Sequence, residues 1–198
     1  MPRVLRYITH PQVKIDPSVP VPDWKLSEIG RKRAVIFARL PLLATTSVIV
    51  SSAEKKARET AEIISSVVNA PIQICENSHE NDRSATGFLE PKEFEKVADQ
   101  FFALPMESTR GWEKAIDAQT RIVSEAVLLM NKKLEGDLLM VGHGAVGTLL
   151  FCHLAKLDIS RKYDQPAGGG HVFAYNINTQ TVCHPWTSIE HLASSKGD

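Results

Sequence analysis

Leu138-Leu139-Met140-Val141-Gly142-His143-Gly144 is the segment that most strongly indicates how this chain folds. A continuous apolar run of this length is typical of a parallel strand that is buried on both faces. A second run, Val4-Leu5-Arg6-Tyr7-Ile8-Thr9, ends at His10 in the same way. Because the carboxyl ends of neighbouring parallel strands share one crevice, we expect His10 and His143 to meet there. Imidazole titrates near neutral pH and can act as nucleophile, base or acid.

Short apolar runs alternate with amphipathic segments, which is typical of β-α-β construction. The patterns predict strands at 3–9, 47–50, 71–75 and 137–142, and helices at 28–40, 54–68, 92–103, 112–133 and 145–156. The end of the chain predicts an antiparallel pair, 171–176 with 181–184, and then a frayed tail at 193–198. We therefore expect a single domain over 1–198, a three-layer α/β/α sandwich with a mostly parallel sheet and a helical insert at about 76–133 over the crevice.

The composition narrows the classes of protein. The 198 residues are 43% hydrophobic, and 23 basic residues balance 23 acidic ones. A balanced charge argues against a nucleic-acid or membrane partner. The cysteines Cys75, Cys152 and Cys183 are widely spaced and odd in number, and no apolar run approaches the length of a membrane span. These features predict a reduced, cytoplasmic protein.

In order and spacing, the motifs of this chain resemble those of the histidine phosphatase superfamily, whose fold is called phosphoglycerate mutase-like. The matching segments are Thr9-His10-Pro11 for the family's Arg-His-Gly, Leu26-Ser27-Glu28-Ile29-Gly30 for its Leu-Thr-x-x-Gly, Ser51-Ser52-Ala53 with Lys56 and Thr60-Ala61 for its Ser-Ser-Pro, Arg and Thr-Ala, and His143-Gly144 for its final His-Gly. The resemblance covers nearly the whole chain. It implies a phosphohydrolase that needs no metal and no other cofactor.

The resemblance also implies roles for individual residues. His10 would attack the phosphoryl group and become phosphohistidine, and His143 would stabilise charge on the transferring oxygens. Glu80 would exchange the proton with the leaving group and with water, and Glu76 and Asp82 compete with it for this role. The substrate would be a phosphorylated small molecule or a phosphoprotein. The predicted substrate-binding residues are Lys56, Arg83, Thr9, Arg58 and His171.

Three positions depart from the family pattern. Thr9 and Lys56 stand where the family has arginines, and Pro11 stands where it has glycine. Arginine binds phosphate through two parallel hydrogen bonds and lysine cannot. Each loss would slow the reaction roughly 10- to 100-fold if the bond acts only in the transition state. Arg83, beside Glu80, and Arg6 are the nearest candidate replacements in sequence, but strand alternation puts Arg6 on the opposite face from Thr9.

Other hypotheses stay open at this point. The departures favour a second one, in which the chain binds a phosphorylated ligand or partner without turning it over. A metal-dependent hydrolase is a weaker third, because no tight pair such as His-x-x-x-His supports it. Mutase activity is disfavoured, because a mutase must keep its phosphorylated form dry. The segment Gly168-Gly169-Gly170-His171 is interpreted first as a flexible loop and second as an anion-binding turn. The sequence leaves the substrate and the oligomeric state open.

Overall fold

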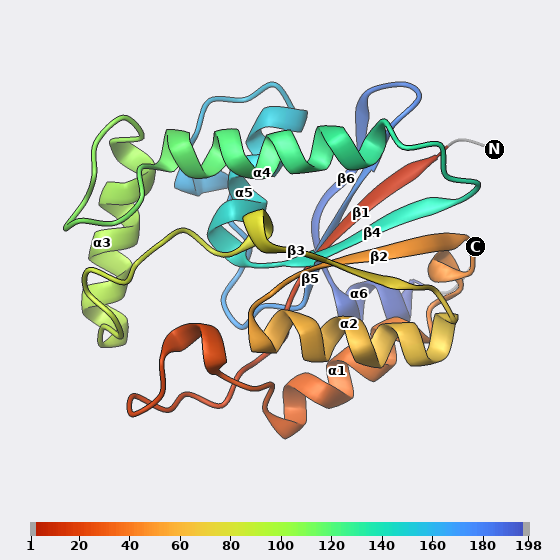
Figure 1. Ribbon diagram of the computed structural model, residues 1–198, viewed down its shortest axis with the longest axis horizontal. Helices are drawn as coiled ribbons and strands as arrows, with labels where there is room; N and C mark the ends of the chain where they lie inside the picture. The colour runs from red at the N-terminus through yellow and green to blue at the C-terminus, as the bar shows by residue number, and fades with distance from the viewer. Residues whose placement is uncertain (1–2, 196–198) are drawn as a thin grey trace.

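A six-stranded sheet forms the centre of the computed structural model, which describes residues 3–195 (Figure 1). The strand order is β3-β2-β4-β1-β5-β6. The strands are β1 Val4–Thr9, β2 Thr46–Ser52, β3 Ile72–Cys75, β4 Asp137–Gly142, β5 His171–Asn176 and β6 Thr181–Ser188. The pairs from β3 to β1 are parallel, and β5 is antiparallel to both of its neighbours.

Helices cover both faces of this sheet. They are α1 Glu28–Ala38, α2 Lys55–Val68, α3 Pro91–Ala103, α4 Ala115–Met130, α5 Gly144–Leu154 and α6 Ile189–Ser194. Short 3-10 turns lie at η1 Val21–Asp23, η2 Pro41–Leu43, η3 Glu76–Ser78 and η4 Arg161–Tyr163. Helices α4 and α5 lie on one face and α1, α2 and α6 on the other (Figure 1). The predicted α/β class with its three layers is therefore confirmed.

Side-chain alternation along the buried strands divides the core between these two faces. In β4, Leu138 and Met140 pack with the residues of α4 and α5, whereas Leu139 and Val141 pack with those of α1 and α2. Every residue of β4 is buried. A strand that is covered on both faces needs apolar residues at every position, and this explains the continuous run in the sequence.

Strand register brings the two histidines to one edge of the sheet. Thr9 of β1 lies beside Gly142 of β4, and the backbone N–H of His10 donates to the Gly142 carbonyl at 2.9 Å. The chain therefore places the residue after β1 and the residue after β4 side by side. Two segments flank this end of the sheet, which lies away from the chain termini (Figure 1). One is the loop that contains η1, and the other is helix α3.

Several predicted boundaries need correction. Helix α4 begins at Ala115 instead of 112, because Trp112 lies in a turn and packs against Phe94 and Phe101. Helix α4 also packs alongside α5, so α3 alone among the helices of the predicted insert flanks the cleft. Strand β6 extends to Ser188.

The predicted frayed tail is partly wrong. Residues Ile189–Ser194 form α6, because the Ser188 hydroxyl accepts from the His191 N–H at 3.1 Å and Ile189 is buried. Within that tail, residues 196–198 lie outside the described residues. No helix in the described part of the chain is long and apolar enough to cross a membrane.

Candidate active site

His10 and His143 lie against each other at the carboxyl ends of β1 and β4. Their ring centroids are 5.3 Å apart, with the planes 66° from parallel. The His10 Nδ1 lies 2.9 Å from the Pro11 carbonyl oxygen, which can only accept a hydrogen bond. Nδ1 therefore carries the hydrogen, and the lone pair is left on Nε2. This is the tautomer in which Nε2 can act as a nucleophile.

His143 is completely buried, and its backbone is fixed by Tyr7. The His143 N–H donates to the Tyr7 hydroxyl at 2.9 Å, and that hydroxyl donates to the His143 carbonyl at 3.1 Å. The Tyr7 ring fills the space beside Gly142, where an added Cβ would lie 2.1 Å from the Tyr7 oxygen. Glycine before His143 is therefore required by this close approach. The ring Nε2 of His143 lies 2.8 Å from the Ser52 hydroxyl.

Both imidazoles are held in the neutral form. Burial, reinforced by the nearby Lys56 cation, lowers the pKa of His10 to about 4. Burial also places the pKa of His143 well below its ordinary value, although the Glu54 carboxylate opposes this shift. Removing an imidazole from water disfavours its charged form. At pH 7 the His10 Nε2 therefore keeps its lone pair.

The Glu80 side chain contacts the first turn of α5, the helix that begins directly after His143. Its carboxylate accepts from the backbone N–H groups of Ala145 at 3.3 Å and Val146 at 3.1 Å. A helix N-terminus favours a negative charge because its N–H groups point outward unpaired. Glu76 and Asp82, the competing acids, also line the larger cavity described below but make no hydrogen bond to α5. Glu80 is thus the predicted acid that the fold brings to the histidines.

Arg121 of α4 holds the loop that carries Glu80. Its guanidinium donates to the carbonyl oxygens of Asn77 at 2.6 Å and His79 at 3.0 Å. The same group forms an ion pair with Glu113 at 2.7 Å. Sequence analysis missed this residue, because nothing near Arg121 in the chain links it to the loop.

Lys56 is buried and paired with Glu54, another residue that sequence analysis missed. The Lys56 ammonium contacts Glu54 Oε2 and donates to the Val21 carbonyl at 2.9 Å. Glu54 Oε1 accepts from the Glu80 N–H at 2.9 Å and lies 3.5 Å from His143 Nε2. Burial alone would raise the pKa of Glu54, but His143 and Lys56 hold it well below its usual range. The sequence did contain a signal for this pair, because the acidic Glu54 lies two residues before Lys56, which stands where the family has an arginine.

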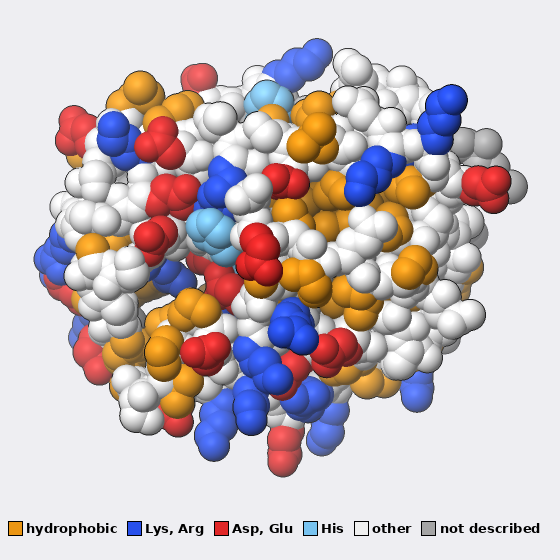
Figure 2. Space-filling model, in the orientation of Figure 1, with side chains coloured by type: hydrophobic (Ala, Val, Ile, Leu, Met, Phe, Trp, Pro, Cys, Tyr) orange, Lys and Arg blue, Asp and Glu red, His pale blue; other side chains and the backbone are white. Residues whose placement is uncertain are grey.

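The cleft around these residues has two parts. The His10 cavity, of about 730 Å³, is lined by His10, Gln12, Phe94, Gly144 and Gln165 among others. The η1 cavity, of about 870 Å³, lies under the 17–23 loop and reaches Glu54 and Phe88. Both cavities are lined by Glu80, Asn81 and Arg83. Figure 2 shows the surface hollowed on the side of the molecule where α3 and the η1 loop lie, with acidic and hydrophobic side chains at the rim.

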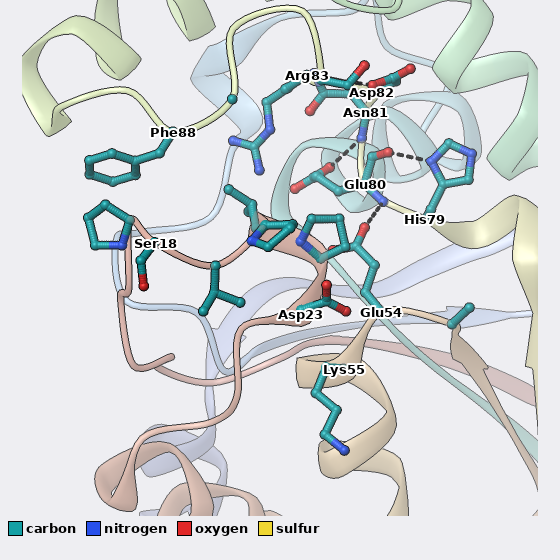
Figure 3. A pocket seen from close by; sticks show the side chains of 18 of the residues that line it. Ser18, Asp23, Glu54, Lys55, His79, Glu80, Asn81, Asp82, Arg83 and Phe88 are labelled. Atoms are coloured by element: carbon teal, nitrogen blue, oxygen red, sulfur yellow. Dashed lines mark hydrogen bonds between the residues drawn. The ribbon is translucent and has the colours of Figure 1, made fainter.

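Arg83 reaches into the cleft from the same loop as Glu80. Its guanidinium carbon lies 5.1 Å from the centroid of the Phe94 ring and 5.7 Å from that of Trp112. In Figure 3 the group points into the η1 cavity between Phe88 and Glu80. Stacking on aromatic faces holds an arginine in place without neutralising its charge.

A family model described as histidine phosphatase superfamily (branch 1) matches residues 17–181. The chain belongs to the histidine phosphatase superfamily. The family predicted from the sequence motifs is thereby confirmed. No curated protein sequence matches the chain.

Solved structures of other histidine phosphatase-like folds superpose on nearly the whole chain. A mycobacterial glucosyl-3-phosphoglycerate phosphatase shares 18% identity and a TM-score of 0.74, covering 96% of this chain and 94% of that chain. YhfR of Bacillus stearothermophilus shares 22% identity and a TM-score of 0.75, covering 92% and 95%. The Entamoeba histolytica phosphoserine phosphatase, in complex with 3-phosphoglyceric acid, shares 17% identity and a TM-score of 0.75, covering 96% and 99%. At these identities the likeness establishes the fold.

Three residues predicted to bind substrate lie elsewhere in this member of the histidine phosphatase superfamily. The Thr9 hydroxyl is buried, donates to Gln165 Oε1 at 2.6 Å and accepts from the His171 N–H at 3.1 Å. The His171 side chain is buried on β5 and does not line either cavity. Arg58 is exposed on α2, because a residue two positions after Lys56 is rotated about 200° around the helix axis.

No metal site is found among residues 3–195, where no three His, Cys, Asp or Glu side chains are grouped closely enough to hold an ion.

From the predicted set, the structure brings together His10, His143, Glu80, Lys56 and Arg83. It adds Glu54 as a contact of Lys56 and Arg121 as a support of the Glu80 loop.

Proposed function

We propose that this protein is a metal-independent phosphohydrolase that cleaves a phosphate monoester or a phosphoprotein through a phosphohistidine on His10. Membership of the histidine phosphatase superfamily and the phosphatases among its structural neighbours support phosphate hydrolysis. The observation that carries the finer proposal is the neutral His10 ring, with Nδ1–H bonded to Pro11 and Nε2 free, 5.3 Å from the His143 ring.

In the first step the His10 Nε2 lone pair attacks phosphorus. The N–P bond forms as the bond from phosphorus to the ester oxygen breaks, and Glu80, which enters this step protonated, donates its proton to the departing oxygen. His143 Nε2 and the Lys56 ammonium stabilise the charge that develops on the other phosphoryl oxygens. Splitting hydrolysis in this way replaces one difficult step by two easier ones.

In the second step water attacks the phosphohistidine. Glu80, now ionised, accepts the proton of the attacking water, and the N–P bond breaks to release phosphate and neutral His10. The low pKa of His10, about 4, supports both its attack and its return to the neutral form at pH 7. Arg83 would bind the part of the substrate that lies in the cleft, because stacking on Phe94 and Trp112 holds its guanidinium there without neutralising its charge.

The test is phosphate release from a panel of phosphate esters and phosphopeptides. Wild type should release phosphate and His10→Ala should not. His153→Ala is the matched control, because His153 is exposed on α5 and lies outside the cleft. Equal rates for wild type and His10→Ala would reject His10 as the nucleophile.

A second candidate function is binding of a phosphorylated ligand or partner without turnover. Two observations favour it: Glu54 occupies Lys56, and Thr9 bonds to Gln165 in place of a phosphate-binding arginine. Acid-labile labelling of His10 with a reactive phosphoryl donor separates the two candidates. Label that forms and then turns over rejects binding without catalysis.

The proposed ligands are phosphorylated molecules in either case, and nucleic acid and membranes are not proposed as partners.

We also propose a cytoplasmic location. The free thiols of Cys75, Cys152 and Cys183 support it, since disulfides are rare in a reducing compartment.

A further inference from the structure

Two hydrogen-bond donors reach the carboxylate of Glu54, and the His143 ring lies beside it. The Lys56 ammonium contacts Oε2, the Glu80 backbone N–H donates to Oε1 at 2.9 Å, and His143 Nε2 lies 3.5 Å from Oε1. Figure 3 shows the Glu80 bond at the wall of the η1 cavity. An ammonium and an amide N–H together form a site for an oxyanion.

Lys56 and His143 are the groups to which the proposed mechanism assigns the phosphoryl oxygens. Lys56 Nζ cannot serve a phosphate fully while it serves Glu54, whose Oε1 also lies 3.5 Å from His143 Nε2. Both side chains are nearly or completely buried, so each has few other partners available. Carboxylate and phosphate oxygens compete for the same donors.

We propose that Glu54 is an internal anion that occupies the phosphoryl-binding position, and that a phosphorylated substrate must displace it to bind. The inference rests on the proposed function, because it concerns the same site. Glu54 also keeps the buried Lys56 charge paired while the site is empty, which avoids the cost of an isolated buried cation. The chain would thus hold itself in a self-inhibited state.

The structure provides a place for the displaced side chain. Glu54 is the residue before the first turn of α2, and its side chain lines the η1 cavity. Lys55 and Arg83 line the same cavity and offer a displaced carboxylate new cationic partners. Rotation about the Glu54 side-chain bonds would move the carboxylate into this space without moving the backbone. The Glu80 N–H, Lys56 and His143 would then be free for the phosphoryl oxygens.

The test measures binding of inorganic phosphate to the full chain by calorimetry, which requires no turnover. Glu54→Gln should bind phosphate about 10- to 100-fold more tightly than wild type, because a neutral amide competes poorly for Lys56. Glu76→Gln is the matched control. Glu76 lines the same cavity and carries the same charge but makes no ion pair with Lys56, so its removal should change the affinity less than about twofold.

Unchanged or weaker phosphate binding by Glu54→Gln would overturn the proposal, as would equal tightening by Glu76→Gln or no detectable binding by any variant. If Glu54→Gln does not fold, Glu54→Asp gives the same comparison, because the shorter side chain retracts the carboxylate from Lys56 and should also tighten binding. Tightening without turnover in any variant would leave this proposal standing and reject hydrolysis. Turnover with unchanged phosphate affinity would reject this proposal alone.

Discussion

At the scale of single residues, the chemistry of the cleft depends on the removal of two imidazoles from water. His10 is half-buried beneath the cleft and His143 has no exposed surface. Neither ring has gained a carboxylate contact strong enough to offset burial, because Glu54 is shared with Lys56. As a result, the His10 nucleophile is neutral at pH 7. The same burial makes the folded protein less stable in acid, because a buried imidazole resists protonation.

The two histidines predict how stability changes with pH. Their pKa values are lower in the folded protein than the ordinary value of 6.5, with His10 at about 4. As the pH falls from 6.5 toward 4, the unfolded chain therefore binds protons before the folded one does, and the free energy of unfolding decreases. Urea unfolding at pH 7 and pH 5 should show this loss in wild type and a smaller loss in His10→Gln.

The exposed His153 supplies the control for this titration. His153→Gln should lose as much stability between pH 7 and pH 5 as wild type does, because His153 is exposed on α5 and lies outside the cleft. Identical losses in wild type and His10→Gln would contradict the expectation that His10 is held neutral by burial.

At the scale of the elements, the site is assembled from strand ends and one helix N-terminus. A histidine directly follows each of the strands β1 and β4, and α5 supplies the N–H groups that hold Glu80. The short apolar runs predicted these strands because local periodicity reports burial. The position of α4 beside α5 was not predictable in this way, since it depends on contacts far apart in sequence.

Arg121 provides a prediction at this scale. Arg121→Gln should lower kcat/KM for a hydrolysed substrate about tenfold, because the 77–80 loop loses charged hydrogen bonds to two carbonyl oxygens. Steady-state kinetics measures the effect, and most of it should fall on kcat if Glu80 moves away from the leaving oxygen. Urea unfolding of the same variant reports whether the fold is kept.

Arg110→Gln is the comparison for Arg121. Arg110 is exposed, and its ion pair is with Glu93, which lines neither cavity, so kcat/KM should stay within about twofold of wild type. A similar decrease in both variants, or no decrease in Arg121→Gln, would show that Arg121 does not position Glu80 through the loop.

At the scale of the whole molecule, stability depends on two half-cores separated by one sheet. Leu138 and Leu139 are adjacent in sequence, but they pack in opposite halves. Leu138→Ala and Leu139→Ala should each lower the free energy of unfolding by about 2–5 kcal/mol, because each leaves a cavity in a buried cluster. Leu128→Ala should cost less than about 0.5 kcal/mol, since Leu128 is exposed on α4.

Urea unfolding followed by far-ultraviolet circular dichroism and by tryptophan fluorescence tests this arrangement. All three variants should unfold in a single transition that both probes report alike, because the strands between the halves are shared. Separate transitions for Leu138→Ala and Leu139→Ala would show instead that the two halves of the core unfold independently.

The sequence by itself determined the α/β class and the meeting of His10 with His143, because apolar periodicity and the residues that follow a strand are local properties. Its ordered motifs, through their resemblance to a known family, indicated the family. It also indicated Glu80, through its place in the ordered motifs. Only the tertiary structure decided that Thr9 bonds to Gln165, that Arg121 holds the Glu80 loop and that Glu54 takes up Lys56 and lies near His143. The physical reason is that such contacts depend on side-chain direction and on packing between distant segments, which the periodicity of a sequence does not record.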